Sequence, residues 1–90
     1  MQRLTAVVHG RVQGVGFRVY TQEEAARLNL VGWVSNRWDG TVQVVAEGPD
    51  ANLERLARWL QHGPSSAHVT DVDLTWAAGT GEFHGFQIRR

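Results

Sequence analysis

The three glycines and the final arginine of the segment "HGRVQGVGFR", residues 9–18, have the types and spacing to bind an anion. Gly10, Gly14 and Gly16 precede Arg18. Glycine adopts backbone conformations that other residues resist, so the main chain of such a loop can approach a ligand closely. A glycine-rich turn that leads into a helix also offers unpaired N–H groups and the positive end of the helix dipole, and arginine adds a charged fork. The segment therefore indicates an anion site; the alternative is a plain turn in which the glycines only relieve strain.

The loop differs from the common phosphate-binding motifs. No Gly-Lys-Ser/Thr follows it, so it is not a Walker A loop, and its glycine spacing is not the Gly-x-Gly-x-x-Gly fingerprint. The segment contains no Cys, Ser, Thr or Asp that could act as a nucleophile. The whole chain lacks cysteine, which excludes disulfides, thiolate metal sites and thiol nucleophiles.

Short strands and helices on both sides of this loop must hold it in position. Period-two alternation predicts a strand in "RLTAVVHG", and approximate helical spacing of Phe17, Tyr20, Ala25 and Leu28 predicts a helix over 17–30. Two further strands, "VGWVSNRW" and "TVQVVAEG", flank Asp39-Gly40, a dipeptide typical of a type I′ hairpin turn. The segment "PDANLERLARWLQHGP" predicts a second helix that buries Leu53, Leu56, Ala57 and Leu60, and "VTDVDLTW" and "GFQIRR" predict a fourth strand and a short terminal one.

The resulting order β-α-β-β-α-β predicts an α+β, ferredoxin-like split βαβ fold. Because strand-helix-strand crossovers are right-handed, the first two strands run in the same direction with the third inserted between them, antiparallel to both. We expect a four-stranded antiparallel sheet in the order 4-1-3-2, the short terminal strand added, and two helices on one face. The whole chain, residues 1–90, is expected to form a single domain.

This topology brings a second polar residue toward the loop. The carboxyl ends of the first two strands share one edge of the sheet, about 10 Å apart across the intervening strand. Side chains alternate along a strand, so if Val34 points to the helices, Asn36 points to the start of the first helix. Asn36 is then the neutral side chain best placed to face Arg18.

Composition narrows the possible partners. Nine arginines, with no lysine, balance nine acidic residues, which argues against a broad nucleic-acid surface. No apolar run is long enough to span a membrane, and the first residues do not resemble a signal peptide. We expect a cytoplasmic monomer that binds neither nucleic acid nor membrane.

Two motifs together resemble a known family. "GRVQGVGFR" followed by "GWVSNRWDGTV", with "GPSSAHV" and the terminal "GFQIRR", is similar to the acylphosphatases, which hydrolyse the carboxyl-phosphate bond of acyl phosphates. The resemblance implies that Arg18 binds the substrate phosphate with the backbone amides of the loop, that Asn36 positions the attacking water, and that no metal or organic cofactor takes part. The loop so implied comprises Gln13, Gly14, Val15, Gly16, Phe17 and Arg18. Thr41, which opens the next strand, is expected to brace the Asn36 amide.

The chemistry is consistent with that resemblance. Without a nucleophile in the loop, direct attack by water on phosphorus is the remaining route, and amides with one guanidinium suit the charge that spreads over the phosphoryl oxygens. A carboxylate leaving group needs little protonation. Arg37 is bulky and leaves substrate access open to question, and Trp38 is expected to shield the substrate edge.

Other functions leave specific signs that the sequence lacks or shows weakly. An RRM-type RNA binder would carry aromatics in "TVQVVAEG", and a metal chaperone would need cysteine. The four histidines lack metal-ligand spacing, and Asp71 and Asp73 are interpreted as a solvated strand face. The main alternative is a regulatory module of the same fold that binds a small anion without turnover.

Overall fold

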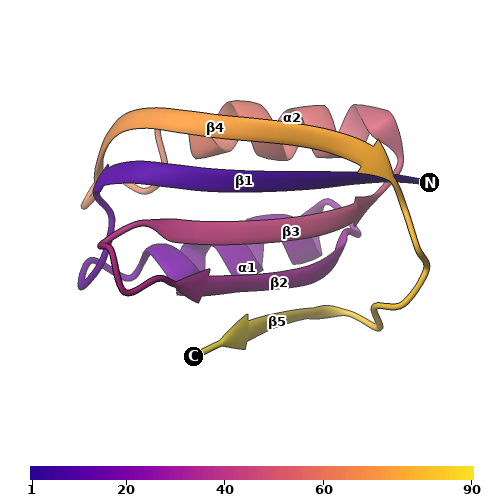
Figure 1. The fold of residues 1–90 in the computed structure, drawn as a ribbon, viewed down its shortest axis with the longest axis horizontal. Coiled ribbons are helices and arrows are strands. Elements are labelled where there is room, and N and C mark those ends of the chain that lie inside the picture. The colour runs from indigo at the N-terminus through magenta and orange to yellow at the C-terminus, as the bar shows by residue number, and fades with distance from the viewer.

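The fold is a five-stranded sheet with two helices on one face (Figure 1). A computed structural model describes residues 1–90. Its elements are β1 (Gln2–Arg11), α1 (Phe17–Arg27), β2 (Val31–Asn36), β3 (Val42–Gly48), α2 (Asp50–Leu60), β4 (His68–Ala78) and β5 (Phe86–Arg89). Neither helix is long and apolar enough to cross a membrane.

The predicted topology is confirmed, and the terminal strand extends it. The strand order is β4-β1-β3-β2-β5, which contains the expected 4-1-3-2 arrangement. β3 runs antiparallel to both β1 and β2, so these two strands point the same way. β5 adds to β2 in parallel, and the complete sheet is therefore mixed.

The core lies between the sheet and the helices, and it follows the side-chain alternation of the strands. The inner positions of β1, β2 and β3 and one side of α2 contribute fully buried residues. These residues are Leu4, Ala6, Val8, Val34, Val42, Val44, Ala46, Leu53, Leu56 and Leu60. The predicted inner face of α2 is confirmed, since Ala57 is buried as well.

Three of the four residues predicted to face the core from the first helix, Phe17, Ala25 and Leu28, are buried, and only Tyr20 is not. Helix α1 also buries Thr21, whereas Tyr20 is 48% exposed. Thr21 tolerates full burial because its hydroxyl donates to the carbonyl of Phe17 at 2.8 Å. The helix also ends at Arg27, earlier than the periodicity predicted, because Asn29 adopts a left-handed conformation with φ of 57°.

The β2–β3 turn is not of type I′, although Asp39 and Gly40 lie in it. A type I′ turn needs positive φ at both residues, and only Gly40 has it, at 91°. Gly40 N–H donates to the carbonyl of Arg37 at 3.2 Å, and Arg37 N–H donates to the carbonyl of Thr41 at 2.8 Å. This is a three-residue hairpin loop, in which a tight turn is followed by a left-handed glycine.

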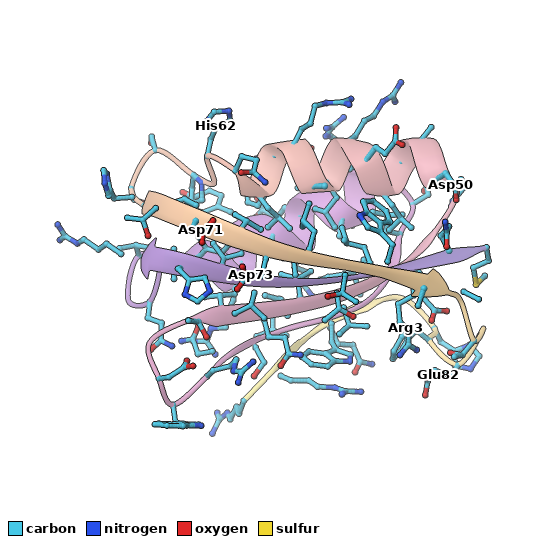
Figure 2. The ribbon with its side chains drawn as sticks, turned by 45° about the horizontal axis from the view of Figure 1, so that its top comes forward. Arg3, Asp50, His62, Asp71, Asp73 and Glu82 are labelled. Atoms are coloured by element: carbon cyan, nitrogen blue, oxygen red, sulfur yellow. The ribbon has the colours of Figure 1, made fainter.

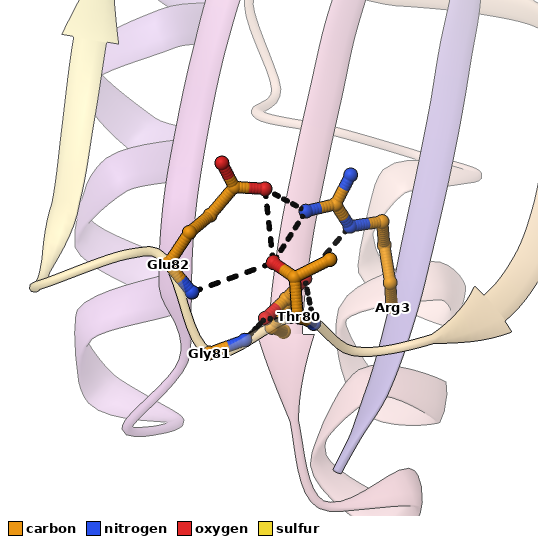
Figure 3. Close-up of polar contacts among 5 residues, drawn as sticks. Arg3, Thr80, Gly81 and Glu82 are labelled. Carbon is orange, nitrogen blue, oxygen red and sulfur yellow. Dashed lines mark hydrogen bonds and ion pairs between the residues drawn. The ribbon is translucent and has the colours of Figure 1, made fainter.

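A buried carboxylate holds the segment that carries the chain from β4 to β5. Glu47, on β3, accepts hydrogen bonds from the backbone N–H groups of Thr80 and Gly81 and from Arg3 Nε at 2.7 Å (Figure 3). Burial of the Glu47 carboxylate by itself raises its pKa, but these bonds outweigh that effect and lower the pKa to about 2. Arg3 also pairs with Glu82 at 2.5 Å, and both residues lie at the end of the sheet where β4 finishes (Figure 2).

Candidate active site

A cavity of about 350 Å³ opens at the edge of the sheet where β1, β2 and β5 end. These three strands run in the same direction, so the chain leaves each of them at this edge. The cavity is lined by Val12, Gly14, Gly16, Phe17, Arg18, Val19, Asn36, Ile88 and Arg90. It therefore combines the glycine loop, the first turn of α1 and the ends of two strands.

The glycine loop leaves a run of backbone donors unpaired. Gly14 and Gly16 have φ of 75° and 79°, a left-handed conformation that other residues adopt at a cost. Gly16 precedes α1 and supplies no side-chain cap for it. The backbone N–H groups from Gln13 to Val19 donate to no acceptor of the protein. Together with the dipole of α1, they make this loop suited to an anion.

Gly10 has a different purpose from the other two glycines. It lies at a bulge between β1 and β4 and has φ of 120°. A Cβ atom there would lie 2.2 Å from the carbonyl oxygen of His68. Gly10 therefore permits a close approach between two strands and does not line the cavity.

Arg18 and Asn36 lie on the wall of the same cavity, as the topology predicted. Arg18 is partly exposed, and its guanidinium makes no hydrogen bond or ion pair within the protein. Val34 is fully buried toward the helices, which places Asn36 on the same side of β2. The Asn36 Oδ1 atom is buried without a hydrogen-bond partner. An unpaired buried acceptor beside a cavity is a position where a bound water or ligand is expected to donate.

The side chain of Gln13 joins the loop to the β2–β3 hairpin. Its amide Nε2 donates to the carbonyl of Arg37 at 2.7 Å and to the carbonyl of Thr41 at 2.8 Å. Gln13 thus connects the segment before Arg18 to the residues that follow Asn36. Sequence patterns did not reveal this contact, because nothing in the residue type indicates which carbonyls it meets.

The other two predicted residues take supporting positions. Val15 packs against the core, and its carbonyl accepts from Ser66 Oγ at 2.8 Å. The expected bond from Thr41 to the Asn36 amide is absent: the Thr41 hydroxyl donates to Asp39 Oδ1 at 2.6 Å. The Thr41 hydroxyl and backbone N–H lower the pKa of Asp39. Thr41 therefore stabilises the hairpin loop.

Arg37 and Trp38 do not obstruct the cavity. The Arg37 guanidinium lies 4.0 Å from the Asp39 carboxylate, and Arg37 is not among the lining residues. Trp38 is 95% exposed and also lies outside the lining, so the expected shielding of the substrate edge is wrong. Asp71 and Asp73 lie on β4 (Figure 2), where both are exposed and Asp73 contacts His9 at 2.9 Å.

Sequence reasoning missed Ile88 and Arg90. The segment "GFQIRR" predicted a strand, but its alternation does not identify the strand beside which it lies. Parallel pairing with β2 brings both residues to the cavity. The wall they complete contains no carboxylate, imidazole or thiolate side chain, so its set of side chains does not suit a divalent metal.

Comparisons with known proteins agree on one family. The family model described as acylphosphatase matches residues 4–88. The acylphosphatase of Salinibacter ruber is 46% identical over 89 residues, covering 99% of this chain and 94% of that protein, and the one of Cupriavidus necator is 51% identical over 83 residues, covering 92% and 88%. The crystal structure of the acylphosphatase from Bacillus subtilis is 40% identical, with a TM-score of 0.96 and coverage of 100% of both chains. The family match includes every residue of the cavity wall except Arg90.

Proposed function

Because this chain belongs to the acylphosphatase family, whose members are hydrolases acting on acyl phosphates, we propose that it performs the hydrolysis in the cavity between Arg18 and Asn36. The observation that carries this assignment is the juxtaposition of three features on one wall. These are a run of unpaired backbone N–H groups, an unpaired guanidinium and an unpaired amide oxygen. Each is a group with which the bound substrate or water would form a hydrogen bond.

The glycine loop and Arg18 bind the phosphate. The N–H groups from Gln13 to Phe17 donate to its oxygens, and the Arg18 guanidinium adds a charge-assisted fork. In the transition state, negative charge spreads over the equatorial oxygens of the transferred phosphoryl group. Donors that are already in place stabilise this charge without having to reorganise.

Asn36 holds the attacking water. Its Oδ1 accepts a hydrogen bond from that water, which orients a lone pair of the water oxygen toward phosphorus. The water oxygen forms a new bond to phosphorus, and the bond from phosphorus to the carboxylate oxygen breaks. The electron pair leaves with the carboxylate, and the water protons pass to the released phosphate and to solvent. A carboxylate is a stable leaving group, so the site needs no general acid.

A rate assay on benzoyl phosphate, with and without a chelator, tests the assignment. We expect Arg18→Gln and Asn36→Ala each to lower kcat by about 10²–10³, the size of effect that follows the loss of one preorganised contact in the transition state. Arg37→Gln is the matched control, since Arg37 is close in sequence but does not line the cavity. Inorganic phosphate should inhibit the parent and inhibit Arg18→Gln far less.

Three outcomes would contradict this proposal. Full activity in both Arg18→Gln and Asn36→Ala would remove these residues from the site, and loss of activity with the chelator would require a metal. Phosphate binding without turnover in the parent would favour the anion-binding regulatory module. The single 1–90 domain, the monomeric state, the cytoplasmic location and the lack of nucleic-acid binding stay predictions.

A further inference from the structure

The last residue of the chain, Arg90, lies beside the proposed catalytic cavity because of how β5 pairs. The parallel register joins Val34 to Ile88 and Ser35 to Arg89. Extending that register by one residue brings Arg90 level with Asn36. Since side chains alternate along a strand, Arg90 is on the same side of the sheet as Asn36.

Arg89 is on the opposite side of the sheet. Its guanidinium lies 4.8 Å from the ring centre of Trp33, and it lines a separate surface depression that does not include Arg18 or Asn36. Arg90, in contrast, lines the cavity and makes no hydrogen bond or ion pair within the protein. Of these two adjacent arginines, Arg90 therefore places its charge at the cavity, and Arg89 places its charge on the opposite side of the sheet.

The charges of the cavity wall exceed what one phosphate group requires. The wall carries two guanidinium groups, Arg18 and Arg90, and no acidic residue, although the chain as a whole has no net charge. Arg18 is adjacent to the unpaired N–H groups of the loop, whereas Arg90 comes from the other end of the chain, directly after β5. Val19 and Ile88, both partly exposed apolar side chains, line the same cavity.

We propose that Arg90 binds a carboxylate on the acyl group, so that the enzyme prefers acyl phosphates whose acyl part carries a second negative charge. This inference rests on the proposed function. The phosphate lies in the glycine loop, the body of the acyl group contacts Val19 and Ile88, and its distal carboxylate accepts from the Arg90 guanidinium. Arg90 is then a specificity-determining residue, and the reaction releases a dicarboxylate and phosphate.

The test compares benzoyl phosphate with its 3-carboxy and 4-carboxy derivatives. The added carboxylate lies at a different distance from the phosphate in each of these two isomers. The measured quantity is the ratio of kcat/KM for the better carboxylated substrate to kcat/KM for benzoyl phosphate. We expect Arg90→Gln to lower this ratio about tenfold, the effect of losing one charge-assisted hydrogen bond at a partly exposed site. The change should be mainly in KM, because the distal carboxylate is bound equally in the ground and transition states.

Two further variants make the result specific. Arg90→Lys keeps the charge and should keep most of the ratio. Arg89→Gln removes the same charge one residue away, on the opposite side of the sheet, and should change the ratio less than about twofold. A general effect of net charge would lower the ratio equally in Arg89→Gln and Arg90→Gln.

An unchanged ratio in Arg90→Gln, an equal fall for all three substrates, or an equal effect of Arg89→Gln would overturn the assignment of Arg90. In each of these cases the parent still hydrolyses benzoyl phosphate, so the proposed function stands. A parent that hydrolyses none of the substrates would instead remove the proposed function, and the role of Arg90 with it.

Discussion

Replacing Glu47 by glutamine should remove a pH-dependent part of the stability of this fold. The Glu47 carboxylate is fully buried and accepts from the N–H groups of Thr80 at 3.0 Å and Gly81 at 3.0 Å, and from Arg3 at 2.7 Å. Burial raises its pKa, and these bonds more than reverse that effect, lowering the pKa from the ordinary 4.5 to about 2. The carboxylate is therefore more stable as an anion in the folded chain than in the unfolded chain.

The size and direction of the effect follow from this difference. A lowering of about 2.5 pKa units corresponds to about 3 kcal/mol of stability. Because the pKa of the folded state is the lower one, the contribution is complete above pH 4.5 and is lost as the pH falls from 4.5 to about 2. The parent should thus exceed Glu47→Gln in free energy of unfolding by about 3 kcal/mol more at pH 7 than at pH 2.

Urea unfolding, followed by tryptophan fluorescence at several pH values between 7 and 2, measures this difference directly. Glu82→Gln is the matched control: Glu82 also pairs with Arg3, but its side chain is 57% exposed, so its effect should be much smaller. A difference between parent and Glu47→Gln that stays constant from pH 7 to pH 2 would refute the reasoning. It would mean that glutamine perturbs packing alone and that the buried charge contributes nothing specific.

Two other substitutions probe the proposed active site and its neighbouring strand. Gln13→Ala removes both bonds between the glycine loop and the hairpin, and we expect kcat/KM for benzoyl phosphate to fall about tenfold or more, whereas an unchanged kcat/KM would show that the two halves hold their positions independently. Gly10→Ala would bring a Cβ within 2.2 Å of the His68 carbonyl, so urea unfolding should show a loss of at least about 2 kcal/mol. Gly14→Ala, where a Cβ meets no atom within 4 Å, is the control for conformational strain alone, and an equal loss in both variants would exclude the steric explanation.

The sequence predicted the elements in which one physical effect dominates. Leu4, Ala6 and Val8 alternate without interruption, so β1 and its inner face followed from period two alone. In α2, Leu53 and Leu60 recur at helical spacing between an acidic start and a glycine stop. The handedness of the crossover, together with the side-chain alternation from Val34 to Asn36, then predicted that Asn36 faces Arg18, and both residues line one cavity.

Other features depended on specific contacts that the pattern of residue types does not reveal. Thr21 can be buried because its hydroxyl donates to a backbone carbonyl. A pattern of hydrophobic residues does not indicate which polar residues lie in the core. The Asp39-Gly40 turn depends on the pairing of Arg37 with Thr41, which lengthens the loop by one residue and excludes type I′ geometry. β5 could not be assigned to an edge, because its four residues contain no signal for a particular partner.

The residue that gives the fold its pH-dependent stability and the residue that pairs with the cavity wall lie at opposite ends of β3. Glu47 lies near the end of this strand, and Val42, at its start, pairs with Asn36. Glu47 is five positions along the strand from Val42, a distance of about 17 Å. Protonation of Glu47 therefore acts far from the glycine loop and Asn36, and two of the N–H groups that it would affect directly, those of Thr80 and Gly81, lie in the segment that feeds β5. We therefore expect the loss of this charge to affect the half of the cavity that bears Ile88 and Arg90 more than the phosphate-binding half, which Gln13 joins to the β2–β3 hairpin.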